Sequence, residues 1–582
     1  MTSLPPSRPT QPAAGRPPWS ALATSLAMWT LSMASAAVAA ATDASAPPAG
    51  ASATRLAPQA SAPNAALNAP PFRAAGSPAE PGVLRPCRLK GVENGAQCGF
   101  IHRALDPAQP AGTQIEVHYA VLPAMARRKA ADPVFFFAGG PGQSAIDLAG
   151  VLSKRYARFS HRRDLVFVDQ RGTGRSAPLK CADDSDRPPL EPLAHATDEA
   201  RRLQRIHECL SALKALPHGD LRQYTTPIAM GDVDAVRAAL GAEQINAIGG
   251  SYGTRAVLEY QRQFPQRVRR AVIDGVAPPD MVLPASFSPD NQAALQAMFA
   301  ACEAEPGCRA RHPDLQRRWQ ALLSGLPARA TLAHPMTGRE ETLTLTRDML
   351  VSLVRGPLYV PTLASGLPAA IDEATRGRFG PLLGLSTAMA GGGAGGLATG
   401  MHFSVVCTED LPRLAGSNEA PGADFGRTFE QMYVKVCADW PRGTVPAAFY
   451  QVPPARQPVL VLSGGIDPVT PPRHGERVTR LLGAKARHVV VAQAGHGVLA
   501  VGCMRDAVVR FVGADSDDEA LKIDLGCADK LPRPGAFRPV GSQTDSQADR
   551  VVAGTAQGHA AAAAATGAAS GAARQPGREG TK

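Results

Sequence analysis

A short glycine-rich turn at residues 249–253 constrains this chain more than any other feature. It reads Gly-Gly-Ser-Tyr-Gly, follows the apolar run 244–248 and precedes a segment with helical character. A Gly-x-Ser-x-Gly between a buried strand and a helix is typical of a nucleophile elbow, which holds its serine in a strained backbone conformation with the hydroxyl exposed. Gly249 and Gly253 are needed because strand and helix pass too close for larger side chains. We therefore predict that Ser251 is a catalytic nucleophile.

A serine hydroxyl needs a base and an orienting carboxylate before it becomes a good nucleophile. The strand-like run 458–463 ends in Gly-Gly-Ile-Asp-Pro, which places Asp467 in a loop at the carboxyl end of a buried parallel strand. The next strand-like run, 487–492, is followed by Gln-Ala-Gly-His-Gly, which places His496 in the following loop. The chain has thirteen histidines, most of which suit surface or capping positions. We predict His496 as the base and Asp467 as its partner.

The developing oxyanion of an acyl-transfer reaction needs backbone N–H donors. The apolar run 134–138 opens into Gly-Gly-Pro-Gly-Gln-Ser, and a glycine loop at that point can present an unobstructed N–H group. We predict the amides of Gly140 and of Tyr252, the residue after the nucleophile, as the two donors. The alternative is an ordinary turn from strand to helix.

A formal match to the dinucleotide-binding fingerprint lies at residues 172–177, after the strand-like run 164–169. Its third small residue should open an amphipathic helix, but Pro178 follows at once, and no ribose-binding acid in a βαβ unit is evident. We expect no nucleotide there. The chain has no Cys-x-x-Cys pair or histidine cluster at ligand spacing, so we expect no metal and no other cofactor.

Together these motifs resemble the proline iminopeptidase and tripeptidyl aminopeptidase group of α/β-hydrolases. The order Ser251, Asp467, His496 along the chain is the α/β-hydrolase order. The resemblance extends from about residue 87 to about residue 534, and its motifs are residues 139–142, 169–176, 249–254, 465–471 and 495–497. The segments 407–410 and 437–441 are similar to the tripeptidyl aminopeptidase branch. Proline iminopeptidases usually carry a histidine where this chain has Ala138, which argues against narrow proline specificity.

Strand-like runs separated largely by helix-length segments predict a mainly parallel, doubly wound sheet, as in the α/β-hydrolase fold. The runs are residues 134–138, 165–169, 244–248, 271–274, 458–463 and 487–492. The long segment between the fourth and fifth runs has helical stretches at 292–302 and 315–323. We predict an α/β-hydrolase core in two parts, 82–276 and 458–540, with an inserted helical cap at 277–457 that shapes the pocket.

The resemblance implies a serine exopeptidase that cleaves near the free amino terminus of peptides through an acyl-enzyme. It also implies acidic cap residues that bind the substrate ammonium, for which Glu409 and Asp410 are the candidates; the alternative is a solvated acidic turn. Two other functions stay open: an esterase or amidase acting on small molecules with the same triad, and a non-catalytic binding protein of the same fold. The expected partner is a peptide or small-molecule substrate.

The amino-terminal residues resemble an export signal. An uncharged, alanine-rich run at 19–41 follows Arg8 and Arg16, and small residues at Ala39 and Ala41 offer a cleavage site. We predict a signal peptide at 1–41, with an uncleaved membrane anchor as the alternative, and no stable membrane association after cleavage. Residues 42–81 and 541–582 have the composition of a disordered linker and tail. The protein is therefore expected to be exported, to the periplasm or the extracellular space.

All ten cysteines lie in the predicted folded part, and an even number in an exported protein favours disulfides. Proximity along the chain suggests one set of pairs, although spacing does not determine connectivity. The suggested pairs are Cys87 with Cys98, Cys181 with Cys209, Cys302 with Cys308, Cys407 with Cys437, and Cys503 with Cys527.

The chain is basic, with a formal net charge of +11 and a pI near 9.3. Its cations occur in short clusters such as 127–129, 162–163 and 269–270, without regularly interleaved aromatic residues for base stacking. We therefore expect no nucleic-acid partner and interpret the charge as solvated surface.

Overall fold

The computed structural model describes residues 80–182, 191–196, 198–390 and 396–537. The predicted signal peptide at 1–41, the predicted tail at 541–582 and nearly all of the predicted linker at 42–81 lie outside these residues, as does most of the glycine-rich run 391–396.

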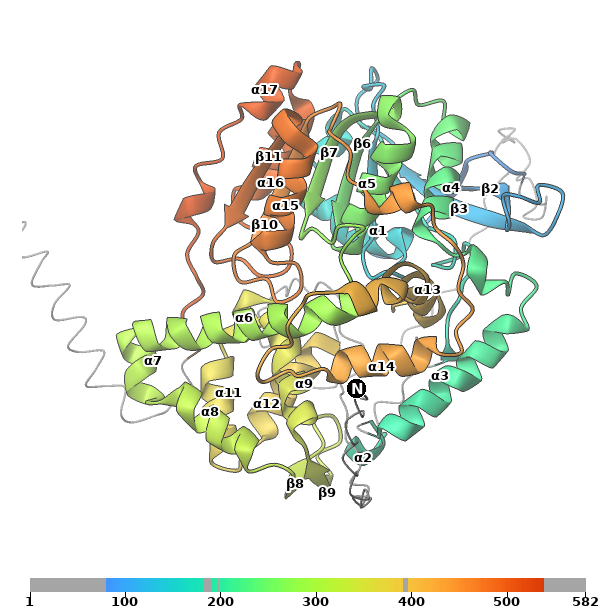
Figure 1. The fold of residues 1–582 in the computed structure, drawn as a ribbon. Helices are drawn as coiled ribbons and strands as arrows, with labels where there is room; N and C mark the ends of the chain where they lie inside the picture. The colour runs from blue at the N-terminus through green and yellow to red at the C-terminus, as the bar shows by residue number, and fades with distance from the viewer. Residues whose placement is uncertain (1–79, 183–190, 197, 391–395, 538–582) are drawn as a thin grey trace, which may run out of the picture.

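A nine-stranded sheet forms the upper half of the molecule, in the order β1-β2-β3-β5-β4-β6-β7-β10-β11 (Figure 1). In this order, the strand pairs β1–β2, β2–β3 and β3–β5 are antiparallel. All the pairs from β5–β4 to β10–β11 are parallel. The strands are β1 (Arg85–Cys87), β2 (Ala96–Ala104), β3 (Gln114–Leu122), β4 (Val134–Phe137), β5 (Leu165–Val168), β6 (Ile245–Gly250), β7 (Val268–Asp274), β10 (Val459–Gly464) and β11 (Ala486–Val491). The mainly parallel sheet confirms the predicted fold class, and its antiparallel edge β1–β3 was not predicted.

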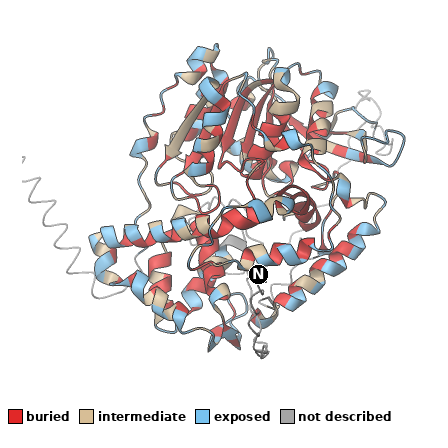
Figure 2. Cartoon of the chain, in the orientation of Figure 1, coloured by how far each residue is buried: buried red, intermediate tan, exposed pale blue. Residues whose placement is uncertain are grey.

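Helices cover both faces of the sheet, so its central strands are buried and apolar on both sides (Figure 2). Along β10, Val459 and Val461 pack into one hydrophobic cluster and Leu460 and Leu462 into another. The first cluster includes residues of α4 (Thr226–Ala239), α5 (Tyr252–Gln263) and α15 (Pro472–Leu482). The second includes residues of α1 (Ala145–Arg155) and α16 (Met504–Gly513). Successive side chains of β10 thus pack against helices on opposite faces of the sheet, as in a doubly wound fold.

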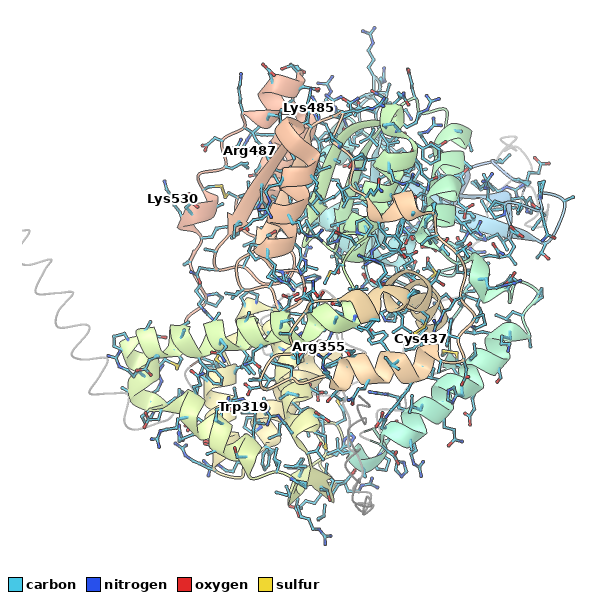
Figure 3. All side chains as sticks on the ribbon, viewed as in Figure 1. Trp319, Arg355, Cys437, Lys485, Arg487 and Lys530 are labelled. Carbon is cyan, nitrogen blue, oxygen red and sulfur yellow. A yellow bond between two sulfur atoms is a disulfide. The ribbon has the colours of Figure 1, made fainter. Side chains whose placement is uncertain are left out.

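The segment between β7 and β10 is mostly helical and lies below the carboxyl ends of the strands in Figure 1. Its elements are α6 (Leu283–Ala304), α7 (Pro306–Arg311), α8 (Leu315–Ser324), β8 (Ala328–Ala333), β9 (Glu340–Leu345), α9 (Arg347–Leu358), α10 (Pro361–Ala364), α11 (Leu367–Thr375), α12 (Gly380–Ala390), α13 (Thr399–Val405), η6 (Val406–Asp410), η7 (Leu411–Gly416), α14 (Thr428–Cys437) and η8 (Ala447–Tyr450). Both helical stretches predicted at 292–302 and 315–323 are present. A third hydrophobic cluster, which includes the buried Trp319, holds this part together (Figure 3).

The helix α3 (Glu199–Lys214) precedes β6 in the chain but lies with the lower helices, where it contacts α13 and α14. A helix from the part of the chain before β6, α3, therefore packs against the insertion at 277–457. The division of the chain into core and cap at these boundaries stays a prediction.

Five disulfides pair all ten cysteines in the combinations that proximity suggested: Cys87–Cys98, Cys181–Cys209, Cys302–Cys308, Cys407–Cys437 and Cys503–Cys527. Cys437 ends α14 and ties it to η6 through Cys407 (Figure 3). Disulfides are typical of proteins that mature in an oxidising compartment. Among the described helices, none combines the length and apolar composition that a membrane span requires.

The segment that matched the dinucleotide fingerprint has a structural role. The side chain of Arg171, just before this segment, is fully buried and donates hydrogen bonds to Asp232 and to the carbonyl groups of Leu105 and Gln223. A Cβ atom on Gly174 would lie 1.8 Å from an Asp169 carboxylate oxygen, so that position has no room for a side chain. Gly174 therefore makes space for the buried carboxylate of Asp169.

The Arg171–Asp232 pair gives a test of the core. Replacing Arg171 with Met leaves Asp232 buried with fewer partners, because only its bond from Arg103 remains, so we expect the free energy of unfolding to fall by about 3–5 kcal/mol. Lys522, 76% exposed in its pair with Asp518, supplies the control: Lys522→Met should cost less than about 0.5 kcal/mol. Urea unfolding with the disulfides intact measures both. Equal effects of the two substitutions would contradict this assignment.

Candidate active site

Ser251 lies at the junction of β6 and α5. Its backbone angles are φ 56° and ψ −128°, and residues other than glycine rarely adopt a positive φ. Its N–H group donates to the carbonyl oxygen of Asp274 at 2.9 Å. A Cβ on Gly249 would lie 2.3 Å from the Gly253 carbonyl oxygen, and one on Gly253 would lie 2.1 Å from that of Phe137. The close approach of strand and helix that the sequence predicted is therefore present.

The structure brings His496 and Asp467 together in the loops after β11 and β10. His496 Nδ1 lies 2.8 Å from Asp467 Oδ2. The other carboxylate oxygen accepts the N–H groups of Val469 and Thr470, and the Thr470 hydroxyl donates to Oδ2 at 2.8 Å. Burial opposes ionisation of Asp467, but the charge of His496 and these hydrogen bonds outweigh it and lower the pKa of Asp467. Asp467 is thus held as a carboxylate.

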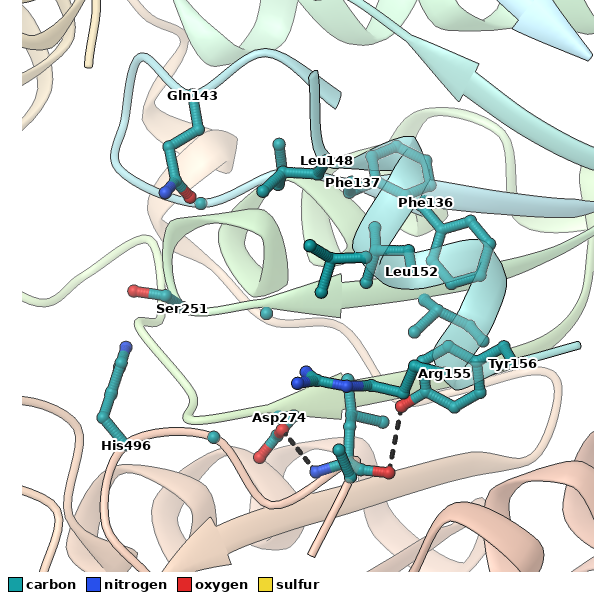
Figure 4. A pocket seen from close by; sticks show the side chains of 18 of the residues that line it. Phe136, Phe137, Gln143, Leu148, Leu152, Arg155, Tyr156, Ser251, Asp274 and His496 are labelled. Atoms are coloured by element: carbon teal, nitrogen blue, oxygen red, sulfur yellow. Dashed lines mark hydrogen bonds between the residues drawn. The ribbon is translucent and has the colours of Figure 1, made fainter. Parts of the chain in front are cut away.

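His496 presents its second nitrogen, Nε2, toward Ser251 in Figure 4. Because Nδ1–H donates to the carboxylate, Nε2 is the acceptor nitrogen of the neutral ring. Nε2 is buried and has no hydrogen-bond partner among the described residues. The Ser251 hydroxyl lines the same pocket and must come within hydrogen-bond distance of Nε2 before it can transfer its proton.

The charge state of His496 is set by two opposing effects. Burial lowers the pKa of His496, but the charge and hydrogen bond of Asp467, together with the charge of Asp274, outweigh it, so the pKa lies above the ordinary value of 6.5. The imidazole is thereby suited to accept a proton. Only the neutral form can act as a base, and it is lost at acid pH.

The two predicted oxyanion donors come from two different segments that pass beside Ser251. Gly139 passes close to the nucleophile, since a Cβ on it would lie 3.3 Å from Ser251 Cβ, and Gly140 follows with φ 112°. Tyr252 opens α5, so its N–H group has no acceptor within the helix. The roles of the Gly140 and Tyr252 amides stay predictions that this arrangement permits.

His402, on α13, supports the loop that carries Gly140. Its Nδ1 lies 3.2 Å from the Pro141 carbonyl oxygen and its Nε2 lies 2.9 Å from the Tyr433 hydroxyl. Burial lowers the pKa of His402 to about 4, so the ring is neutral near pH 7, donates to Pro141 and accepts from Tyr433. The Ala398 N–H group also donates to the Gly142 carbonyl at 2.9 Å. No motif marks His402 in the sequence, because it contacts this loop only through the fold.

Asp274, the last residue of β7, was likewise not predicted from the sequence. Its backbone carbonyl accepts from Ser251, and its carboxylate accepts the N–H groups of Val498 and Leu499, just after His496, at 2.7 and 2.8 Å. Burial raises the pKa of Asp274 to about 6. An acidic residue at the carboxyl end of the predicted strand 271–274 was the signal that could have identified it.

The structure places Glu409 and Asp410 away from the pocket that Ser251 lines. Both side chains are fully buried in η6 and pair with Arg255, which is also fully buried, at 3.2 and 3.0 Å. Glu409 further accepts the N–H and hydroxyl groups of Thr226, whose hydroxyl contacts the Tyr252 hydroxyl at 2.7 Å. These contacts favour a structural role, in which the pair anchors η6 to the helix that follows the nucleophile. Ammonium binding by either residue stays a prediction.

A mainly apolar pocket leads from Ser251 and His496 along α1 (Figure 4). Asp274 lines it next to Ser251, and Tyr359 and Val360 from the inserted segment also line it. The apolar walls are Phe136, Phe137, Ile248, Leu148, Val151, Leu152, Tyr156 and Leu499. Such a pocket can take an apolar part of a substrate next to the reacting carbonyl group.

Glu409 makes the free energy of unfolding depend on pH in a way that can be measured. Burial raises the pKa of Glu409 from 4.5 to about 7, so the folded state binds its proton more tightly than the unfolded state does. This contribution to stability is fully present below about pH 4.5 and is lost as the pH rises through about 7. The free energy of unfolding of the wild type, relative to Glu409→Gln, should therefore fall between pH 5 and 8. Urea unfolding across this range tests it, and a constant difference would contradict it.

Comparisons with known proteins agree with this geometry. A family model described as "alpha/beta hydrolase fold" matches residues 132–312, and one described as "TAP-like protein" matches residues 421–519. Serine protease Hip1 of Mycobacterium tuberculosis is 27% identical over 434 residues, which cover 68% of this chain and 82% of that protein. Carboxylesterase B of the same species is 28% identical over 419 residues, covering 67% of this chain and 78% of the relative.

Tripeptidyl aminopeptidase of Streptomyces coelicolor is 33% identical over a shorter stretch of 196 residues, which cover 31% of this chain and 35% of that protein. The fold, the elbow with its adjacent histidine and carboxylate, and the two family models point the same way. The chain has the α/β-hydrolase fold, part of it is similar to TAP-like proteins, and it is a serine hydrolase.

Proposed function

We propose that this protein is a serine peptidase that cleaves peptides near their free amino terminus through an acyl-enzyme on Ser251. The observation that carries the proposal is the hydrogen-bonded His496–Asp467 pair whose remaining nitrogen faces a serine in a nucleophile elbow. Relatives named as a serine protease and a tripeptidyl aminopeptidase support peptides as the substrate class.

In the proposed reaction, Ser251 Oγ attacks the scissile carbonyl carbon while its proton passes to His496 Nε2. The tetrahedral oxyanion accepts hydrogen bonds from the amides of Gly140 and Tyr252. Collapse of the intermediate breaks the C–N bond, and the departing amine takes the proton from His496. A water molecule, deprotonated by His496, then hydrolyses the acyl-enzyme ester. Asp467 keeps the imidazole in the required tautomer and stabilises its protonated form.

An esterase or amidase acting on small molecules is the second candidate. It rests on the similarity to a protein named carboxylesterase B over two thirds of the chain, because the same triad hydrolyses esters. A non-catalytic binding protein is the weakest alternative, because it would have no need of a strained serine beside a paired histidine. The disulfides and the predicted signal peptide together support export, to the periplasm or the extracellular space.

The function is tested by hydrolysis of a ladder of chromogenic mono-, di- and tripeptide amides, each with a free and an acetylated amino terminus, alongside short-chain esters. We expect cleavage of free-amine peptides, with the step length given by the best substrate, and a loss of roughly 10⁴ to 10⁶-fold in turnover in Ser251→Ala. Glu409→Gln and Asp410→Asn report on amine recognition, because only a direct contact would change the preference for free over acetylated peptides. Ester cleavage without peptide cleavage would establish the second candidate instead.

The His496–Asp467 pair predicts a specific pH profile. Because Asp467 raises the pKa of His496, kcat/KM should rise with pH through a value above 6.5. In Asp467→Asn the larger raising influence is lost and only the weaker one of Asp274 remains against burial, so the acid limb should move to lower pH. Turnover should fall by about 10³ to 10⁴-fold, because the tautomer is no longer fixed. Asp518→Asn, at an 85% exposed position, is the control, and an unmoved acid limb in Asp467→Asn would argue against the assignment.

A further inference from the structure

The apolar pocket beside Ser251 does not end at α1 but continues into a groove on the surface. The two cavities share Val151, Arg155 and Ala500 in their walls. A substrate segment that starts at Ser251 and follows the pocket therefore reaches this groove. Arg155 lies at the junction and extends from α1 across the pocket in Figure 4.

The groove is basic, in contrast to the pocket. Lys90, Lys154, Arg155 and Arg505 line it, and Asp147 is the only acidic residue among its described lining residues. Lys154 contacts Glu93 at 3.4 Å, but both side chains are well exposed and the pair is correspondingly weak. Lys90 and Arg505 are exposed and form no ion pair with any residue that the structure describes. The outer end of the path therefore carries a local positive charge.

The positive charge of the groove indicates which part of a peptide binds in the pocket and groove. In a peptide attacked near its amino terminus, the acyl part carries the free ammonium group, which the groove would repel. The leaving part carries the carboxyl terminus, which the groove would attract. Asp274 lines the inner end of the pocket, where its carboxylate disfavours an anionic group close to Ser251. The apolar walls between these two ends suit an apolar side chain.

We propose that the pocket and groove bind the leaving part of the peptide. The residue after the scissile bond places an apolar side chain between Phe136, Leu152 and Leu499, and the substrate's carboxylate pairs with the cations of the groove. The preferred substrates are thus short peptides with a free carboxyl terminus and an apolar residue after the cleaved bond. This inference rests on the proposed peptidase function.

The carboxylate preference is tested with two peptides of one sequence, one ending in a free carboxylate and the other in a carboxamide. At about 0.05 M salt we expect kcat/KM of the wild type to be about fivefold higher for the carboxylate peptide than for the carboxamide peptide, because its KM is lower. At about 0.5 M salt this preference should shrink. Arg505→Glu should abolish or reverse it. Arg329→Glu, an exposed position on β8 with the same change of charge, should leave it intact.

The apolar preference is tested with peptides that carry Phe or Gly after the scissile bond. The wild type should favour Phe. Leu152→Trp fills the pocket and should lower kcat/KM by about tenfold or more for Phe but not for Gly, whereas Leu152→Ala should reduce the discrimination by widening the pocket. Equal effects on both peptides in both variants would overturn this part of the proposal.

The outcomes separate this inference from the proposed function. Cleavage of both the carboxylate and the carboxamide peptide at equal rates, unchanged in Arg505→Glu, would overturn the inference and leave the peptidase function standing. Absence of cleavage of either peptide, with Ser251-dependent ester hydrolysis retained, would overturn the peptidase function itself.

Discussion

The left-handed backbone of Ser251 is the constraint on which the rest of the site depends. Such a conformation costs on the order of 1–3 kcal/mol and persists only where the surroundings hold it. Here the close contact of β6 with α5 and the bond from the Ser251 N–H group to Asp274 hold it. The Asp274 carboxylate at the same time fixes the amides of Val498 and Leu499, next to His496. The nucleophile and its base therefore share one support at the end of β7, between β6 and β10 in the sheet.

The inserted helical segment supports the same loops from the other side. His402 holds the Pro141 carbonyl in the loop of the predicted oxyanion donor, and the carbonyl oxygen of Tyr359 accepts the N–H group of His496. Arg255, on the helix after Ser251, is bound by Glu409 and Asp410 of η6. The Gly140 loop, the His496 loop and α5 thus each take a contact from a segment far away in the chain. The insertion for this reason supports the candidate catalytic loops, and we expect substitutions in it to affect turnover without touching substrate.

The features that the sequence predicted are those that short segments encode. The glycines around Ser251, and the loops of Asp467 and His496 after apolar runs, report local backbone geometry and the common edge of a parallel sheet, so they could be placed before the fold was known. The cysteine pairs were close enough in the chain for proximity to suggest them. His402 could not be found, because its contact with Pro141 is made only by the packing of the insertion. The contacts of Glu409 and Asp410 with Arg255 were not predictable for the same reason, because Arg255 meets them only in the fold.

Net charge is likewise uninformative until the cations are located. Several arginines are enclosed by the protein's own carboxylates, Arg171 by Asp232 and Arg255 by Glu409 and Asp410, so they add nothing to the field that a substrate meets. Lys90 and Arg505 are different, because they face solvent at the end of a path that begins at Ser251. A charge at that position acts on the substrate within about a Debye length of 8 Å, and salt weakens its effect. The basic composition of the chain therefore bears on specificity through a few exposed side chains at the end of the pocket.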